Sequence, residues 1–563
     1  MLLWFVIAYL MVSVGIGLWA ATRVHNTKDF AVAGRSLPLP IVTATVFATW
    51  FGAEAVFGVS AQFVKDGLSG VVADPFGSSL CLVIAGLFFA NKLYKLNILT
   101  VGDFYRMRYN RTVEVITSLC IVGSYLGWVS AQIKAMGLIF SVITNGAVSP
   151  ELGMIIGAAI VLTYTTFGGM FSVAILDFVQ MTVSMGGLLF IAWTVSGMTG
   201  GAGVVIEHAA QAGKFEFFPP PDPWMWLTFL GALLTMMLGS LPQQDVFQRV
   251  TSAKSAKIAV AGSLLGASIY FCFTFVPMFI AYSATLIDPQ LFNNLLEKDS
   301  QLILPTLVLQ HMPLFAQILF FGAVLSAIMS CSSATLLAPS VMFAENIVKG
   351  YFPHLSDRKF LWIMRVTIVT FASIVLLFAL NSESSIFHMV ESAYKITLAG
   401  AFIPLVVGAF WKRATTQGAL AATLGGLISW ILVELLVGEA SPIPPQLIGL
   451  VVSAFGMLIG SLLPQRYGVA HLKIVDLEAR RHELAAGGRQ GRLHGLAIVD
   501  ALGGLAHAAM EHGRSGALVF AQIDIARGHG QPVGFAAEPP RPARDQRPRL
   551  GRVRPVSEGR GFP

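Results

Sequence analysis

The chain has 563 residues, of which 55% are hydrophobic and only 12% are charged. Soluble domains carry roughly 25% charged residues, so this composition excludes an ordinary soluble protein. The net charge of +7 comes mainly from the end of the chain, because residues 466–563 hold 15 basic and 9 acidic residues and leave 22 and 21 for residues 1–465. Residues 1–465 therefore give no reason to expect a nucleic-acid partner.

Apolar runs long enough to cross a bilayer recur throughout residues 1–465, and they predict an all-α polytopic membrane protein. The first run, Leu2–Ala21, has no basic segment before it, so we expect a retained span rather than a cleaved signal peptide. We predict about 13 transmembrane helices, at 2–22, 39–64, 70–91, 112–142, 151–167, 172–197, 225–242, 258–286, 314–344, 360–380, 386–410, 415–437 and 446–463.

The loops between these spans differ in charge. Loops after odd-numbered spans contain 16 basic residues, whereas loops after even-numbered spans contain 3. Because cytoplasmic loops carry the excess of Lys and Arg, we predict an outside N-terminus and a cytoplasmic C-terminus in a plasma (inner) membrane. Residues 466–563 are rich in Arg, Gly and Pro, which predicts a disordered basic cytoplasmic tail after a transmembrane domain at 1–465.

The second span contains features that are unfavourable in a simple membrane helix. Glu54 is a carboxylate at membrane depth, and Gly52 and Gly58 weaken the helix around it. We interpret this stretch as a broken helix that lines a transport site, where freed backbone carbonyls coordinate a small cation. Trp50 and Phe57 would offer aromatic walls to a solute. The alternative is that the two glycines only allow close helix packing.

Two further spans carry acidic residues. Asp74 precedes Pro75 in the third span and is a candidate to hold a substrate amine or hydroxyl, unless it lies near the outer interface. Asp177 shares a helix face with Gln180 in the sixth span, close to its cytoplasmic end, which suits an ion exit path. The alternative for this pair is a polar contact between helices.

The seventh and ninth spans hold the remaining candidates. Pro242 ends or kinks the seventh span, and Gln243 follows it, which indicates a mobile gate. The ninth span clusters four serines around a cysteine, and hydroxyl oxygens suit a hard alkali cation whereas a thiol does not. Serines can instead bond back to their own helix. The cluster consists of Ser326, Ser330, Cys331, Ser332 and Ser333.

Four segments in chain order resemble the sodium/solute symporter family: DFAVAGRSLPLP, YTTFGGMFSVAILDFVQ, GSLPQQDVFQRVTSAKSAK and the serine-rich ninth span. The resemblance implies a LeuT-type 5+5 inverted repeat with two broken helices, in core repeats at about 39–197 and 225–410. It also implies a sodium site between the second and ninth spans and an exit path at Asp177. The ligands would be backbone oxygens of Ala48, Phe51 and Ala327, the Ser330 side chain and position 331.

The chain departs from the family pattern at two positions. Cys331 stands where a second hydroxyl is usual, which leaves room for proton coupling. The segments ATWFG, ADPFG and SVMFAENI resemble the high-affinity choline transporters, and Trp50 matches an aromatic of their pocket, but Gln243 stands where a Trp is expected. A quaternary ammonium needs an aromatic cage, so this loss favours a more polar solute. The candidate solute ligands are Trp50, Glu54, Phe57, Asp74 and Gln243.

These observations predict a sodium-coupled symporter that imports a small polar organic solute by alternating access. Sodium is the expected co-transported ion, and the expected partners are the solute and the lipid bilayer. We do not expect an enzyme, because the spans contain no nucleophile, histidine and acid set. The alternatives are a proton-coupled carrier of the same fold, choline or quaternary-ammonium uptake, and a transporter-like solute sensor.

Overall fold

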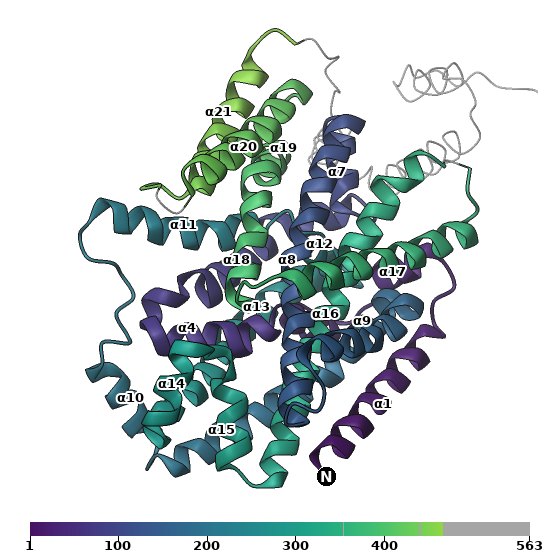
Figure 1. The fold of residues 1–563 in the computed structure, drawn as a ribbon. Coiled ribbons are helices and arrows are strands. Elements are labelled where there is room, and N and C mark those ends of the chain that lie inside the picture. The colour runs from purple at the N-terminus through teal and green to yellow at the C-terminus, as the bar shows by residue number, and fades with distance from the viewer. Residues whose placement is uncertain (353, 439–440, 466–563) are drawn as a thin grey trace, which may run out of the picture. The chain divides into compact units, whose positions relative to one another are not determined.

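The computed structural model describes residues 1–352, 354–438 and 441–465, which lie in the first of two units, Met1–Leu477 and Glu478–Pro563 (Figure 1). The predicted disordered tail at 466–563 lies outside the described residues. The described part is helical, and its one isolated β-bridge joins Leu37 to Ala253. The prediction of an all-α membrane protein is confirmed.

The helices follow one another with short connections. In the first half they are α1 (Leu2–Ala21), α2 (Thr27–Val32), α3 (Leu39–Trp50), α4 (Val59–Asp66), α5 (Ser78–Ile84), α6 (Asn91–Lys95), α7 (Val101–Arg108), α8 (Arg111–Ile143), α9 (Pro150–Met198) and α10 (Ala202–Gln211). In the second half they are α11 (Pro223–Gly239), α12 (Gln244–Ser252), α13 (Ala256–Ile287), α14 (Pro289–Lys298), α15 (Ile303–His311), α16 (Leu314–Asn346), α17 (Asp357–Asn381), α18 (Ile386–Thr397), α19 (Ile403–Phe410), α20 (Thr416–Leu436) and α21 (Pro445–Leu462).

Among the described residues, 10 helices are long and apolar enough to cross a membrane, or up to 11 if the bent pair α11 and α12 is one span. This number is lower than the predicted 13 for local reasons. The predicted fifth and sixth spans are two helices that meet at Gly169, where φ is +48° and ψ is −143°, and they count together as the single element α9. The predicted second span is divided, so α3 alone has only 12 residues.

The predicted outer loops and the N-terminus lie at the same end of this unit. Figure 1 shows α10, α14 and α15 near the start of α1, with α7 and the top of α21 toward the other end. The α7 end is the one where the basic loops gather. A buried polar cluster anchors α7 there, because the Asn346 amide donates to Asp103 at 3.0 Å and to Glu114 at 2.9 Å.

Candidate functional site

The predicted second span is broken at the expected position. Its first half, α3, ends at Trp50, and Phe51 leaves the helical region with φ −86° and ψ 80°. The chain then bends at Gly52 and resumes as a π-helix, η2 (Glu54–Gly58), that continues into α4. This stretch is buried throughout, which fits irregular backbone that is enclosed by protein.

The break changes the backbone hydrogen bonds around Ala48. In a continuous helix the Gly52 N–H would donate to the Ala48 carbonyl, four residues back. Here it donates to the Trp50 carbonyl at 3.1 Å. The next N–H, of Ala53, donates to the Gln132 side chain of α8 at 2.8 Å. The Ala48 carbonyl is thereby released from its α-helical bond with Gly52, which is the change that cation coordination by this carbonyl requires.

Gly52 lies directly against α16. A β-carbon at this position would sit 2.6 Å from Gln132 Oε1, 2.7 Å from Cys331 Cβ and 2.8 Å from Cys331 Sγ. The structure therefore brings the break of the second span next to position 331 of the ninth.

We predict that Gly52→Ala lowers the free energy of unfolding by about 1–3 kcal/mol, because an added methyl group overpacks this contact. Gly123→Ala in α8 is the matched control, since a β-carbon there would meet no atom within 4 Å. The thermal unfolding midpoints of the two purified variants measure the difference. Equal midpoints would show that the close approach of Gly52 to Cys331 does not constrain the fold.

Asp177 of α9 lies at the centre of a hydroxyl cluster. Thr45 of α3 donates to one carboxylate oxygen and Ser330 of α16 donates to the other. All three residues are buried, with at most 1% of their surface exposed. Asp177 was predicted on an exit path, and it directly contacts Ser330, a candidate sodium ligand. Oxygen atoms from three helices, of the hard type that alkali cations prefer, thus meet one turn from Ala48.

The other three serines of the cluster donate hydrogen bonds to backbone carbonyls of α16 itself. Ser332 donates to the Ile328 carbonyl at 2.6 Å, Ser333 to the Ser330 carbonyl at 3.0 Å and Ser326 to the Gly322 carbonyl at 2.7 Å. Ser326 also bonds to Tyr9 of α1. Of the four serines, Ser330 is therefore the one whose hydroxyl is directed at a carboxylate. Ala327 lies three residues before Ser330 and four residues before Cys331, so it shares a face of α16 with both.

An aromatic cluster surrounds Trp50. Its ring is parallel to Tyr394 of α18, with the centroids 6.2 Å apart and the planes inclined by 6°. Trp128 of α8 lies 5.6 Å from both rings, at steep angles to each. Tyr125 stacks on Trp128 at 5.9 Å. Four rings from three helices therefore adjoin the break of the second span, and the hydroxyl of Tyr394 is buried without a hydrogen-bond partner among the described residues.

Gln243 belongs to the same region. It follows α11 at the break of the seventh span, where the helix axes of α11 and α12 differ by 43°. Its side-chain nitrogen donates to Ser124 at 2.8 Å, next to Tyr125 in α8. Its side-chain oxygen is buried without a partner in the described part of the chain, so it is free to accept a hydrogen bond.

Asp74 and Phe57 lie apart from this aromatic cluster. The Asp74 carboxylate accepts from Tyr270 of α13 at 2.6 and 2.7 Å and from Ser78. Tyr270 in turn packs edge-on against Phe47 and Phe51 of α3. Phe57 is fully buried, and none of the ring contacts found between described residues joins it to Trp50. The five candidate solute ligands are thus not one cluster.

Glu54 is the least satisfied of the candidates. It is 4% exposed, and its Oε1 atom has no hydrogen-bond partner among the described residues. It interacts electrostatically with Asp74 and with Glu391 of α18. A buried carboxylate that lacks partners is costly, which indicates that a cation, a proton or a ligand group completes its environment.

The second half of the broken seventh span, α12, adds a buried charge cluster that the sequence interpretation did not include. Arg249 of α12 is 2% exposed, and its Nε and Nη2 atoms have no hydrogen-bond partner in the described residues. It interacts electrostatically with Asp245 and Asp177. Asp245 is bonded through its carboxylate and its backbone N–H to the Tyr125 hydroxyl. With both carboxylates ionised, these three charged groups carry a net charge of −1.

Sequence reasoning did not single out five residues of these clusters, which are Thr45, Tyr125, Trp128, Tyr394 and Arg249. Thr45, Trp128 and Tyr394 each look ordinary within their own helices. The one available signal is an aromatic or polar residue at helical spacing on the buried face. Many positions that only pack against a neighbouring helix have the same property, so the signal does not identify a site. Arg249 was counted instead as a loop charge.

Comparison with known proteins decides the family. The model of the sodium:solute symporter family matches residues 30–426. The chain belongs to the sodium:solute symporter family. The predicted resemblance is therefore confirmed, and the chain is a symporter of this family.

Relatives of this symporter transport different compounds. It is 29% identical to the human high affinity choline transporter 1 over 447 residues, covering 75% of this chain and 74% of the relative. It is 25% identical to the sodium/glucose cotransporter of Vibrio parahaemolyticus over 452 residues, covering 74% and 82%. It is 26% identical to the sodium/proline symporter of Escherichia coli over 499 residues, covering 84% and 95%.

Solved structures show the same fold. A Na+-coupled sialic acid symporter in its substrate-bound outward-open state matches with a TM-score of 0.70 and 18% identity, covering 83% of this chain and 98% of that one. Mhp1, a nucleobase-cation-symport-1 family transporter, matches with a TM-score of 0.50 and 14% identity, covering 79% and 98%. The symporter therefore has the LeuT-type fold that the resemblance implied.

Proposed function

We propose that this symporter imports a small polar organic solute together with sodium by alternating access across a plasma membrane, with its N-terminus outside. The observation that carries the ion site is the Asp177 carboxylate, which accepts from Thr45 and Ser330 one turn from the released Ala48 carbonyl. Sodium would bind backbone oxygens of Ala48, Phe51 and Ala327, the Ser330 hydroxyl and position 331. Asp177 would receive the ion on its way inward.

The charge of the surrounding cluster supports this proposal. Asp177, Asp245 and Arg249 together carry −1 in a buried site, and one sodium ion would neutralise them. Sodium would also join α3, α9 and α16, which are distant in sequence and pack against one another at this cluster. Ion binding would thus stabilise the arrangement in which the solute site beside Trp50 is assembled, and that is the coupling a symporter needs.

Uptake into proteoliposomes tests the function directly. Labelled choline, betaine, proline, glucose and lactate are offered with an inward sodium gradient, an inward proton gradient or neither. We expect sodium to drive the accumulation of one compound class. If a proton gradient drives accumulation and a sodium gradient has no effect, the proposed sodium coupling is wrong and the chain is a proton-coupled carrier.

The cysteine in the ion site gives a prediction of its own. Cys331→Ser is expected to lower the sodium concentration that half-saturates binding about tenfold, because a hydroxyl binds a hard cation better than a thiol does. Radioactive sodium binding to the purified protein measures this value. Cys81→Ser, at a buried cysteine of α5, is the control and should leave it unchanged. An unchanged or higher value for Cys331→Ser would place this side chain outside the ion's coordination shell.

A quaternary ammonium is the second candidate solute, favoured by the aromatic cluster. Aromatic faces attract cations, and several rings together form a cage. A quaternary ammonium has no N–H group to donate a hydrogen bond, so it depends on such a cage. Trp50, Trp128 and Tyr394 supply three such rings. The preference for another polar solute was based on position 243, which holds Gln where a Trp is expected. These three rings supply the aromatic surface that this position lacks. The choline transporter relatives accord with this candidate.

A further inference from the structure

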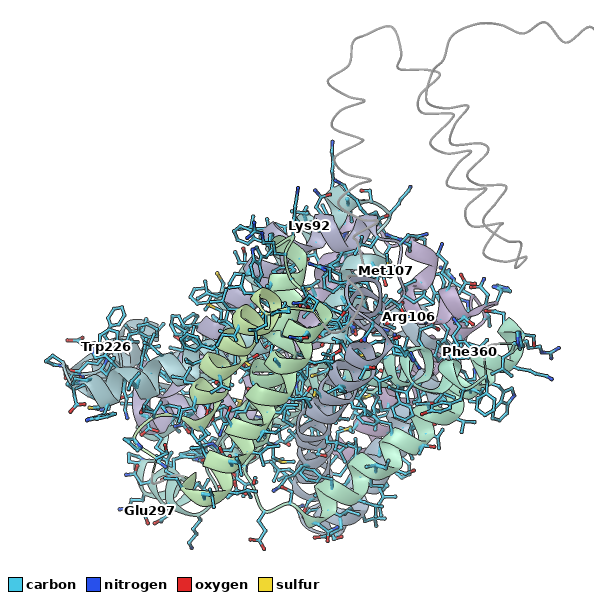
Figure 2. The ribbon with its side chains drawn as sticks, turned by 90° about the horizontal axis from the view of Figure 1, so that it is seen from above. Lys92, Arg106, Met107, Trp226, Glu297 and Phe360 are labelled. Atoms are coloured by element: carbon cyan, nitrogen blue, oxygen red, sulfur yellow. The ribbon has the colours of Figure 1, made fainter. Side chains whose placement is uncertain are left out.

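A cavity of about 400 Å³ lies away from the transport site, on the end of the molecule where the basic loops gather. Three segments that are distant in sequence form its walls: α2 and the turn after it, the chain before α7, and the connection from α16 to α17. Figure 2 shows Arg106 of α7 and Phe360 of α17 on the same side of the molecule. The residues that matter for its chemistry are Thr27, Lys28, Arg35, Lys349, Asp357 and Phe360.

The cavity carries an excess of positive charge. Lys28 makes no ion pair among the described residues, whereas Lys349 is paired with Glu345 at 2.5 Å outside the lining. Arg35 is held in place, because its guanidinium donates to Asn97 and lies 4.2 Å from the centre of the Tyr94 ring. The lining therefore contains three basic side chains against one acidic side chain.

The Asp357 carboxylate and the buried Thr27 hydroxyl are two further polar groups in the cavity lining. Asp357 already accepts from the Thr27 backbone N–H at 3.1 Å. The Thr27 side chain is 5% exposed, and its hydroxyl has no hydrogen-bond partner among the described residues. A buried hydroxyl without a partner is unfavourable, so its presence in the lining points to a ligand that carries acceptor oxygens.

Apart from Asn97, which accepts from Arg35, the other side chains of the lining are apolar and include Val32, Leu99, Leu355 and Phe360. A free phosphate ion would gain nothing from these side chains. A phospholipid would contact both parts, with its phosphate at the basic groups and the start of its acyl chains at the apolar wall. Anionic leaflets attract basic protein segments close to the membrane surface.

We propose that this cavity binds the phosphate headgroup of an acidic phospholipid from the leaflet that faces the basic loops. The lipid would join the segment that leads into α3 to the segment that leads out of α16. These two helices carry the proposed sodium ligands. The bound lipid would therefore hold together the ends of α3 and α16 that lie nearest the basic loops.

The test uses the full chain in detergent, with phosphatidylglycerol or phosphatidylcholine added. Native mass spectrometry measures retained lipid, and the thermal unfolding midpoint measures stabilisation. We expect preferential retention of phosphatidylglycerol with a rise in the midpoint. Lys28→Gln and Lys349→Gln should each weaken retention about fivefold. Lys95→Gln is the control, because Lys95 is exposed on the same loops but does not line the cavity.

Inorganic phosphate and glycerol phosphate form the second arm. A midpoint rise as large with these soluble ions would show a free phosphate site instead of a lipid site. Equal retention of the two lipids, or an equal effect of Lys95→Gln, would overturn the proposal. Sodium binding by the lysine variants without lipid should equal that of the parent, so a failure here is distinct from a failure of the proposed transport function.

Discussion

Ser330→Ala is expected to raise the sodium concentration for half-saturation at least tenfold. The variant removes both a proposed sodium ligand and a hydroxyl that donates to the buried Asp177 carboxylate. A hydrogen bond to a charged group contributes about 1.5–3 kcal/mol, and 1.4 kcal/mol corresponds to a tenfold change in affinity. Binding of radioactive sodium to the purified protein measures the effect without knowledge of the solute.

Ser332→Ala is the matched control for this experiment. Ser332 lies two residues away in the same helix, is equally buried and donates to the Ile328 carbonyl of its own helix. It should leave sodium affinity within about twofold, since a back-bonded serine contributes nothing outside its helix. If both variants weaken sodium binding alike, the effect belongs to the packing of α16 and the assignment of Ser330 as a ligand is wrong.

Trp128→Leu is expected to weaken choline binding about 30-fold if the solute is a quaternary ammonium. A desolvated cation over an aromatic face gains about 2 kcal/mol, which is the interaction that leucine cannot supply. Trp128→Phe should recover part of the affinity, because phenylalanine retains a ring. Equilibrium binding of labelled choline in the presence of sodium gives the dissociation constants.

Trp193→Leu is the control for this variant. Trp193 is 73% exposed on α9 and contacts Phe190, outside the aromatic cluster. The neutral carbon analogue of choline separates a cation–aromatic interaction from plain apolar contact. If the parent protein binds the analogue as tightly as choline, the quaternary ammonium candidate fails and the polar solute remains.

The break of the second span was accessible to sequence reasoning for a physical reason. A carboxylate flanked by glycines at membrane depth is unfavourable in a simple helix. Glu54 is such a carboxylate, because Gly52 and Gly58 lie within five residues of it on either side. The number of spans was less accessible. Hydropathy does not show whether two helices that meet at a kink, as at Gly169 within α9, cross the membrane once or twice.

Local sequence also left the roles of the four serines of α16 open. All four have the same chemistry and similar neighbours, so only the direction of each hydroxyl separates them. That direction depends on what lies opposite. Ser330 faces Asp177 of α9, whereas Ser332 has its own helix carbonyl within reach and bonds to it.

By itself the sequence determined the membrane class, the family and the broken second span, because these follow from composition, hydropathy and short motifs along the chain. The tertiary structure decided which side chains meet. Trp50, Trp128 and Tyr394 form one aromatic cluster, and Thr45, Asp177 and Ser330 form one polar cluster, although each set comes from three helices. Contacts between helices depend on how their faces are oriented in the folded bundle, and no pattern within a single helix specifies the residue that another helix places opposite it.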